Sequence, residues 1–147
     1  MALLIGFSLA LAVALYATFL GLDRERAFYS TVLAVVGSLY GLFAVMSGST
    51  QTLLLEALFI AAFLLLSALG FKFSPWLLVA GLFAHGVFDF FHGHIITNSG
   101  MPAYWPNFCM SYDITAAAYL AWLIRRRSPV KEPTDPSFAS GESAYRR

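Results

Sequence analysis

The stretch PWLLVAGLFAHGVFDFFH, residues 75–92, decides the class of fold. At about 1.5 Å per residue, a helix of this length covers roughly 27 Å, close to the hydrocarbon thickness of a bilayer, about 30 Å. It begins with a proline, which suits the first turn of a helix because the N–H there has no partner to lose. Its second half carries His85, Asp89 and His92 among phenylalanines. This stretch therefore predicts a membrane-spanning helix with one polar face.

Four further apolar stretches of similar length accompany it. The five predicted spans run from Ala2 to Leu22, Ala27 to Met46, Thr52 to Phe71, Pro75 to His92 and Phe108 to Ile124. Of the 147 residues, 59% are hydrophobic and only 12% are charged, whereas a soluble domain carries about 25% charged residues. We predict an all-α integral membrane bundle of five transmembrane helices, with the lipid bilayer as its main partner.

Charge and cysteine content exclude other classes of protein. The net charge is +1, and no basic patch lies outside the termini, which argues against nucleic acid as a partner. Cys109 is the single cysteine, so the chain has no internal disulfide and no cysteine-based zinc cluster. An ordinary buried thiol is the preferred interpretation of this residue.

The cations predict an orientation. Between and directly after the predicted spans, Lys and Arg occur only at Arg24, Arg26, Lys72 and Arg125 to Arg127. All of these fall on one side if every span crosses, and cytoplasmic loops retain positive charge. The expected topology in the cell membrane therefore has the N-terminus outside and the C-terminus in the cytoplasm. Residues 1–22 also resemble a cleaved signal peptide, but cleavage would place residues 23–26 outside and break the charge pattern.

Residues 1–127 are thus predicted to form one transmembrane domain. Residues 128–147 contain three prolines and alternating charges, so we expect a disordered cytoplasmic tail. Gly37 and Gly41 have the small-residue spacing of a helix-packing face, which suits packing within the bundle and leaves oligomerisation through this face open.

Ionisable residues inside the spans indicate function, because a charge near the bilayer centre costs about 2.5 to 3.5 kcal/mol on insertion scales. His85, Asp89 and His92 lie at positions i, i+4 and i+7, within roughly 60° on one helix face. Counting from the span ends places Glu56 and Asp113 at the same outer depth. The third, fourth and fifth spans are therefore expected to converge on one polar site.

Imidazoles and carboxylates together are typical ligands of divalent metals, zinc first and iron or manganese next. We predict His85, Asp89 and His92 as metal ligands, and Asp113 and Glu56 as catalytic carboxylates. Any two of His85, Asp89 and His92, together with Asp113 or Glu56, would form a less strained ligand set than all three. A metal-bound water next to a carboxylate can attack an ester or amide, which predicts a hydrolase acting on a lipid-like substrate.

Two other interpretations remain open. The polar residues can form one wall of an ion or proton path, although few polar residues continue it through the inner half. They can also pair across helices in a structural subunit of a larger complex, with the carboxyl groups neutral. The loop after the fourth span is long enough to cover the outer mouth, where His94, Asn98 and Ser99 can reach a ligand.

The segment from His85 to Asp113 follows the pattern HGxxDxxHxH, then NxGxP, then WPxFCxxYD. It resembles the signature of a small uncharacterised family of bacterial multi-pass membrane proteins. This resemblance covers the last two spans and implies a bacterial inner-membrane location, but no activity. A weaker similarity, in chemistry alone, is to the alkaline ceramidases, which hold zinc with histidines and use an aspartate in a bundle of seven helices.

Overall fold

The structure, a computed structural model, describes residues 1–127 as five α-helices joined by short connections. They are α1 (Ala2–Leu20), α2 (Arg26–Ser47), α3 (Thr50–Lys72), α4 (Pro75–Ile95) and α5 (Trp105–Arg127), with a 3-10 turn, η1 (Leu22–Arg24), between α1 and α2. The described residues contain no β-strand, so the all-α prediction is confirmed. The predicted tail, residues 128–147, lies outside the described residues.

Glycines and serines at the helix termini explain where the helices begin and end. Gly21 and Gly48 follow α1 and α2 with φ of 77° and 69°, the left-handed backbone that glycine adopts at helix C-termini. The Ser49 hydroxyl accepts the N–H of Thr52 and starts α3, and the Ser74 hydroxyl accepts the N–H of Trp76 at the start of α4. These signals confine four of the helices to nearly the lengths predicted.

Four of the five helices, α1 to α4, are long and apolar enough to cross a membrane. The prediction of five such helices is therefore confirmed for four. α5 has 23 residues and so sufficient length, but it is more polar than the others, with Asp113 near its middle. It also begins three residues before the predicted fifth span and ends three residues after it.

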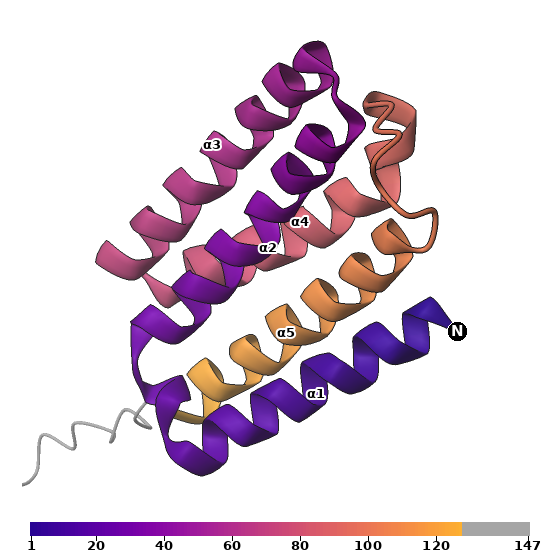
Figure 1. The fold of residues 1–147 in the computed structure, drawn as a ribbon. Helices are drawn as coiled ribbons and strands as arrows, with labels where there is room; N and C mark the ends of the chain where they lie inside the picture. The colour runs from indigo at the N-terminus through magenta and orange to yellow at the C-terminus, as the bar shows by residue number, and fades with distance from the viewer. Residues whose placement is uncertain (128–147) are drawn as a thin grey trace, which may run out of the picture.

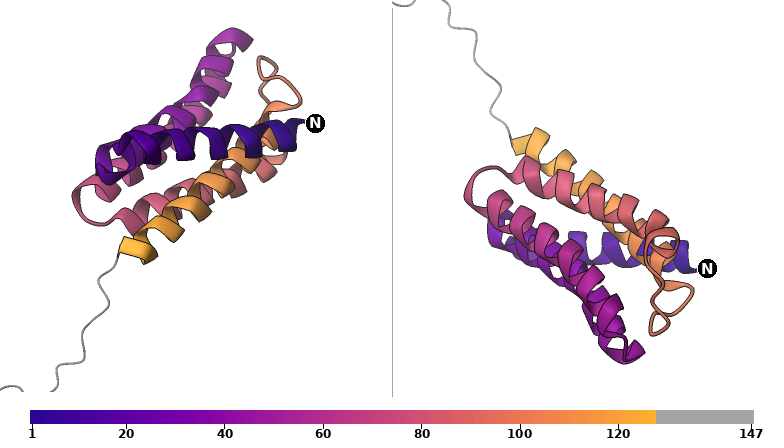
Figure 2. Two further views of the ribbon diagram at one scale, coloured as in Figure 1. Left: turned by 90° about the horizontal axis from the view of Figure 1, so that it is seen from below. Right: turned by 90° about the horizontal axis from the view of Figure 1, so that it is seen from above.

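Successive helices run in opposite directions (Figure 1). The N-terminus and the α2–α3 and α4–α5 connections lie at one end of the bundle, and the other two connections and the end of α5 lie at the opposite end, here called the basic end. α4 contacts α2, α3 and α5, while α1 packs along α5. Figure 2 shows the same bundle from below and from above, each view turned by 90° from that of Figure 1. The Lys and Arg residues of the described helices and turns gather at the basic end.

Glycines set the closest helix contacts. A Cβ built on Gly86 of α4 would lie 2.9 Å from Ile114 Cγ1 and 3.2 Å from the Met110 carbonyl of α5. The Gly37 and Gly41 face packs against Phe63 and Ile60 of α3. This face therefore serves packing within the chain, as one interpretation of its spacing predicts, and oligomerisation through it stays a prediction.

Candidate metal centre

The five polar residues expected inside the spans are all buried. Glu56, His85, Asp89, His92 and Asp113 are each at most 1% exposed. His85, Asp89 and His92 project from one face of α4 into the bundle, as their spacing predicts. Phe83 and Phe90, on other faces of α4, are 54% and 62% exposed and point toward the surroundings.

His85 is the centre of the first polar group, named here the metal group: His85, Asp89 and Asp113. His85 Nδ1 is hydrogen-bonded to Asp113 Oδ2 of α5 at 2.7 Å and lies 3.5 Å from Asp89 Oδ2 one turn along α4. Each of the three residues offers a ligand atom, and these atoms lie within 4.8 Å of one another. The close approach of α4 to α5 at Gly86 brings Asp113 within reach of His85.

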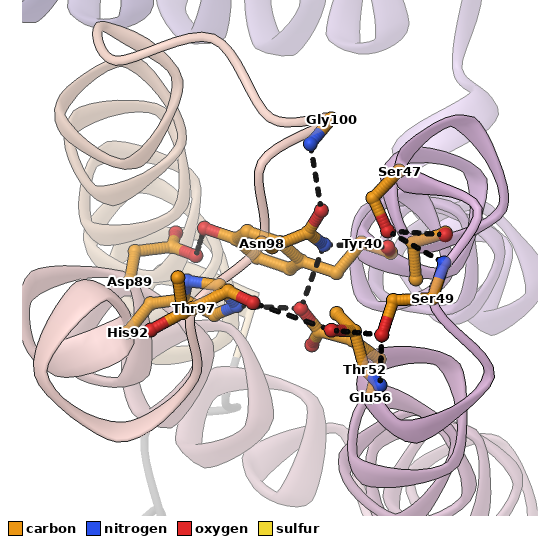
Figure 3. A network of polar contacts seen from close by, with 11 residues as sticks. Tyr40, Ser47, Ser49, Thr52, Glu56, Asp89, His92, Thr97, Asn98 and Gly100 are labelled. Atoms are coloured by element: carbon orange, nitrogen blue, oxygen red, sulfur yellow. Dashed lines mark hydrogen bonds and ion pairs between the residues drawn. The ribbon is translucent and has the colours of Figure 1, made fainter.

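His92, on the same face of α4, belongs to a second polar group, which it forms with α3. Its Nε2 lies 2.8 Å from Glu56 Oε1 of α3. Asn98, in the connection before α5, donates to the same carboxylate oxygen at 3.0 Å and to the Tyr40 carbonyl at 3.4 Å (Figure 3). The Gly100 N–H donates to Asn98 Oδ1, which fixes the orientation of the Asn98 amide.

Tyr40 of α2 joins the two groups. Its hydroxyl donates to Asp89 Oδ1 at 2.7 Å, and its ring stacks on His92, with centroids 4.0 Å apart and planes 13° from parallel. Figure 3 shows Tyr40 between Asp89 and Glu56. Helices α2, α3, α4 and α5 thus all contribute to one connected polar cluster.

The structure divides the predicted residues differently from the sequence-based assignment. Asp113, expected as a catalytic carboxylate, joins His85 and Asp89 in the metal group. His92, expected as a metal ligand, pairs with Glu56. The metal group is one of the less strained ligand sets considered from the sequence, with His85 and Asp89 from α4 and Asp113 from α5.

Several polar atoms of the cluster are buried and have no hydrogen-bond partner in the described part of the chain. They are His85 Nε2, Asp89 Oδ2 and Asp113 Oδ1 in the metal group, and Glu56 Oε2 and His92 Nδ1 in the second group. A buried polar atom without a partner costs about 1–3 kcal/mol, so five in one cluster require an explanation. A cation bound in the metal group would provide a partner for Asp89 Oδ2, and also for Asp113 Oδ1 if that carboxylate binds through both oxygens.

The spacing of the metal group suits such an ion. Bonds of about 2.0–2.1 Å to zinc in tetrahedral geometry place neighbouring ligand atoms roughly 3.3 Å apart. The distance from His85 Nδ1 to Asp89 Oδ2, 3.5 Å, is close to this value. The hydrogen-bonded distance to Asp113 Oδ2, 2.7 Å, would have to lengthen by roughly 0.6 Å.

Two residues of the cluster are not predicted as site residues from the sequence. Tyr40 is not singled out by any pattern, and Asn98 is one of three loop residues expected to reach a ligand. Of those three, Asn98 is buried in it, whereas His94 and Ser99 are exposed. Cys109 is 2% exposed and is not a member of the metal group, in keeping with an ordinary buried thiol.

A scan against models of protein families, a search of curated proteins and a search of solved structures found no match to this chain.

Proposed function

We propose that this chain is a multi-pass integral membrane protein that binds one divalent metal ion through His85, Asp89 and Asp113. One observation carries the proposal: an imidazole and two carboxylates from two helices converge within 4.8 Å and are wholly buried. Apolar helices tolerate such groups only when they have partners or a function.

Charge balance favours a divalent cation at this place. Two ionised carboxylates beside a neutral imidazole carry two negative charges, and a buried ion costs several kcal/mol unless it is paired. Protonation of His85 would offset one of these charges, whereas a divalent ion offsets both. One nitrogen and two oxygen ligands suit zinc first and iron or manganese next.

We further propose that α5 crosses the bilayer as a fifth span in the cell membrane. It has the length of its neighbours, packs against both α1 and α4, and turns Asp113 toward α4. The positive-inside rule then assigns the basic end to the cytoplasm and the N-terminus to the outer side.

A hydrolase acting on a lipid-like substrate is the catalytic form of this proposal. Three protein ligands leave at least one coordination position, where a metal ion activates water. Glu56, whose Oε2 has no hydrogen-bond partner in residues 1–127, is the carboxylate of the cluster outside the metal group. The burial of all five residues favours metal binding ahead of catalysis, because a substrate would need a path into the cluster.

A proton path has less support from the structure. Nearer the basic end, the Ser30 and Ser67 hydroxyls pair 2.8 Å apart between α2 and α3, and no hydrogen bond within residues 1–127 connects this pair to the cluster. A purely structural pairing predicts a stable bundle without metal, and the following measurement decides between it and our proposal.

The test is metal content by mass spectrometry of the full chain, purified without chelator and then incubated with zinc and dialysed. We expect one zinc per chain, lost in both His85→Ala and Asp113→Asn. His94→Ala is the matched control, because it removes an exposed histidine from the same helix. Cobalt substitution should give visible absorption bands in the wild-type protein and in the control. A folded wild-type protein that retains no metal, or a His85→Ala variant that retains as much as His94→Ala, would overturn the proposal.

A further inference from the structure

A second candidate site lies at the basic end of the bundle. A cavity of about 300 Å³ opens there between η1, the first turns of α2 and α4, and the last turns of α5. Its lining combines charged residues of the η1 region and Arg127 with Tyr29 and the leucines Leu78, Leu120 and Leu123. This volume is at the lower end of the range of small-ligand pockets, about 300–1,000 Å³.

One acidic residue of the lining, Asp23, forms an ion pair with Arg127. Arg127 Nη2 lies 2.8 Å from Asp23 Oδ2, and Nη1 donates to the Asp23 carbonyl at 2.9 Å. The Thr18 hydroxyl also donates to Asp23 Oδ2. These contacts connect the end of α5 to η1. Because Asp23 and Arg127 pair with each other, the net charge of the lining comes from Arg24, Glu25 and Arg26.

Positive charge exceeds negative charge among those three. Arg24 and Arg26 are exposed and form no ion pair within the part of the chain that the structure describes, and Glu25 lies between them. The N-terminal turns of α2 and α4, which begin at Arg26 and Pro75, add the partial positive charge of helix ends. The mouth of the cavity therefore favours an anion.

The interior offers an unused hydrogen-bond donor and an apolar wall. Tyr29 is 3% exposed, and its hydroxyl has no hydrogen-bond partner among the residues that the structure describes. A buried hydroxyl is normally paired, so an acceptor supplied by a ligand would remove the deficit. Leu78, Leu120 and Leu123 provide a surface that a simple inorganic anion does not need.

We propose that this cavity binds the phosphate group of a membrane phospholipid. Arg24 and Arg26 contact the phosphate oxygens, Tyr29 donates to a phosphate or ester oxygen, and the leucines contact the glycerol and first acyl carbons. Basic pockets between transmembrane helices at the cytoplasmic side are typical sites for anionic head groups. The proposal is independent of the metal centre.

The test measures phosphatidylglycerol retained by the full chain after extraction from nanodiscs of phosphatidylcholine and phosphatidylglycerol, by native mass spectrometry. In R24Q/R26Q we expect retention to fall about 30-fold, the effect of two surface cations. R125Q/R126Q is the matched control: it removes the same charge at the same end, but those arginines stack on Trp76 and Trp122. We expect a loss below about threefold in this control, because its side chains are engaged elsewhere.

Tyr29→Phe should lower retention by about threefold to tenfold without loss of thermal stability, because the hydroxyl it removes has no hydrogen-bond partner within residues 1–127. Equal losses in the two double variants would show non-specific attraction and overturn the site. Equal retention of phosphatidylcholine would overturn the preference for an anionic head group. If inorganic phosphate alone stabilises the protein against heat, and R24Q/R26Q abolishes this effect, the site binds free phosphate and the assignment of a phospholipid is overturned.

Discussion

The pairing of His92 with Glu56 leads to a quantitative prediction. His92→Phe keeps a ring that can stack on Tyr40 but removes Nε2, which lies 2.8 Å from Glu56 Oε1. Glu56→Met removes the carboxylate and keeps a side chain of similar length. Hydrogen bonds between transmembrane helices contribute about 0.6 kcal/mol on average and about 1.7 kcal/mol at most. Both side chains are wholly buried and the contact is short, so we expect a coupling free energy of about 1.5 kcal/mol.

The assay is reversible unfolding in mixed micelles of the wild-type protein, the two single variants and the double variant, all free of metal. The contribution of Asn98 to Glu56 cancels, because Glu56→Met occurs on both sides of the cycle. The matched control is the cycle of Ser30→Ala and Ser67→Ala, whose hydroxyls also join two helices, Ser30 being half-buried and Ser67 buried. About 0.6 kcal/mol is expected there. A coupling between His92 and Glu56 no larger than that of the serines would refute the reasoning.

The α4–α5 contact, the connection after α4 and the membrane orientation can each be tested by substitution. Gly86→Ala inserts a methyl group where α5 already makes close contact, so unfolding should be easier by about 1–2 kcal/mol and zinc retention lower; wild-type stability and zinc content would contradict the packing described. Asn98→Ala removes three hydrogen bonds, so amide exchange at residues 96–104 should accelerate, and unchanged exchange would show that Asn98 does not hold this segment. In a Cys109→Ala background, Ser99→Cys should react with an impermeant maleimide from outside intact cells and Glu25→Cys only after permeabilisation; the reverse pattern would invert the proposed topology.

The sequence predicted the helices and the polar face of α4 because both follow from local periodicity. His85, Asp89 and His92 share a face whatever surrounds the helix, and burial confirms that the face is internal. Periodicity does not determine which neighbour lies on each side of α4. Glu56 and Asp113 have similar depth, but α3 and α5 approach α4 from different directions, so the two carboxylates meet different histidines.

The contributions of Tyr40 and Asn98 depend on contacts that no local pattern encodes. Tyr40 lies among apolar residues of α2, where a tyrosine is ordinary, and its role follows only from the packing of α2 on α4. Asn98 belongs to an irregular connection whose path depends on where α5 begins. The arrangement of the other helices around α4 brings both residues to the cluster.

The polar cluster also bears on how this bundle assembles. α4 exchanges hydrogen bonds with Tyr40 of α2, Glu56 of α3 and Asp113 of α5. In hydrocarbon, apolar side chains gain little from one helical neighbour over another, because lipid tails are equally apolar. Turning α4 by one residue, about 100°, would change its apolar contacts little but would direct imidazoles and carboxylates toward lipid. The cluster therefore fixes the rotation of α4 about its own axis. In the membrane bundle that we propose, removing the cluster should give helices that still insert but associate in several arrangements.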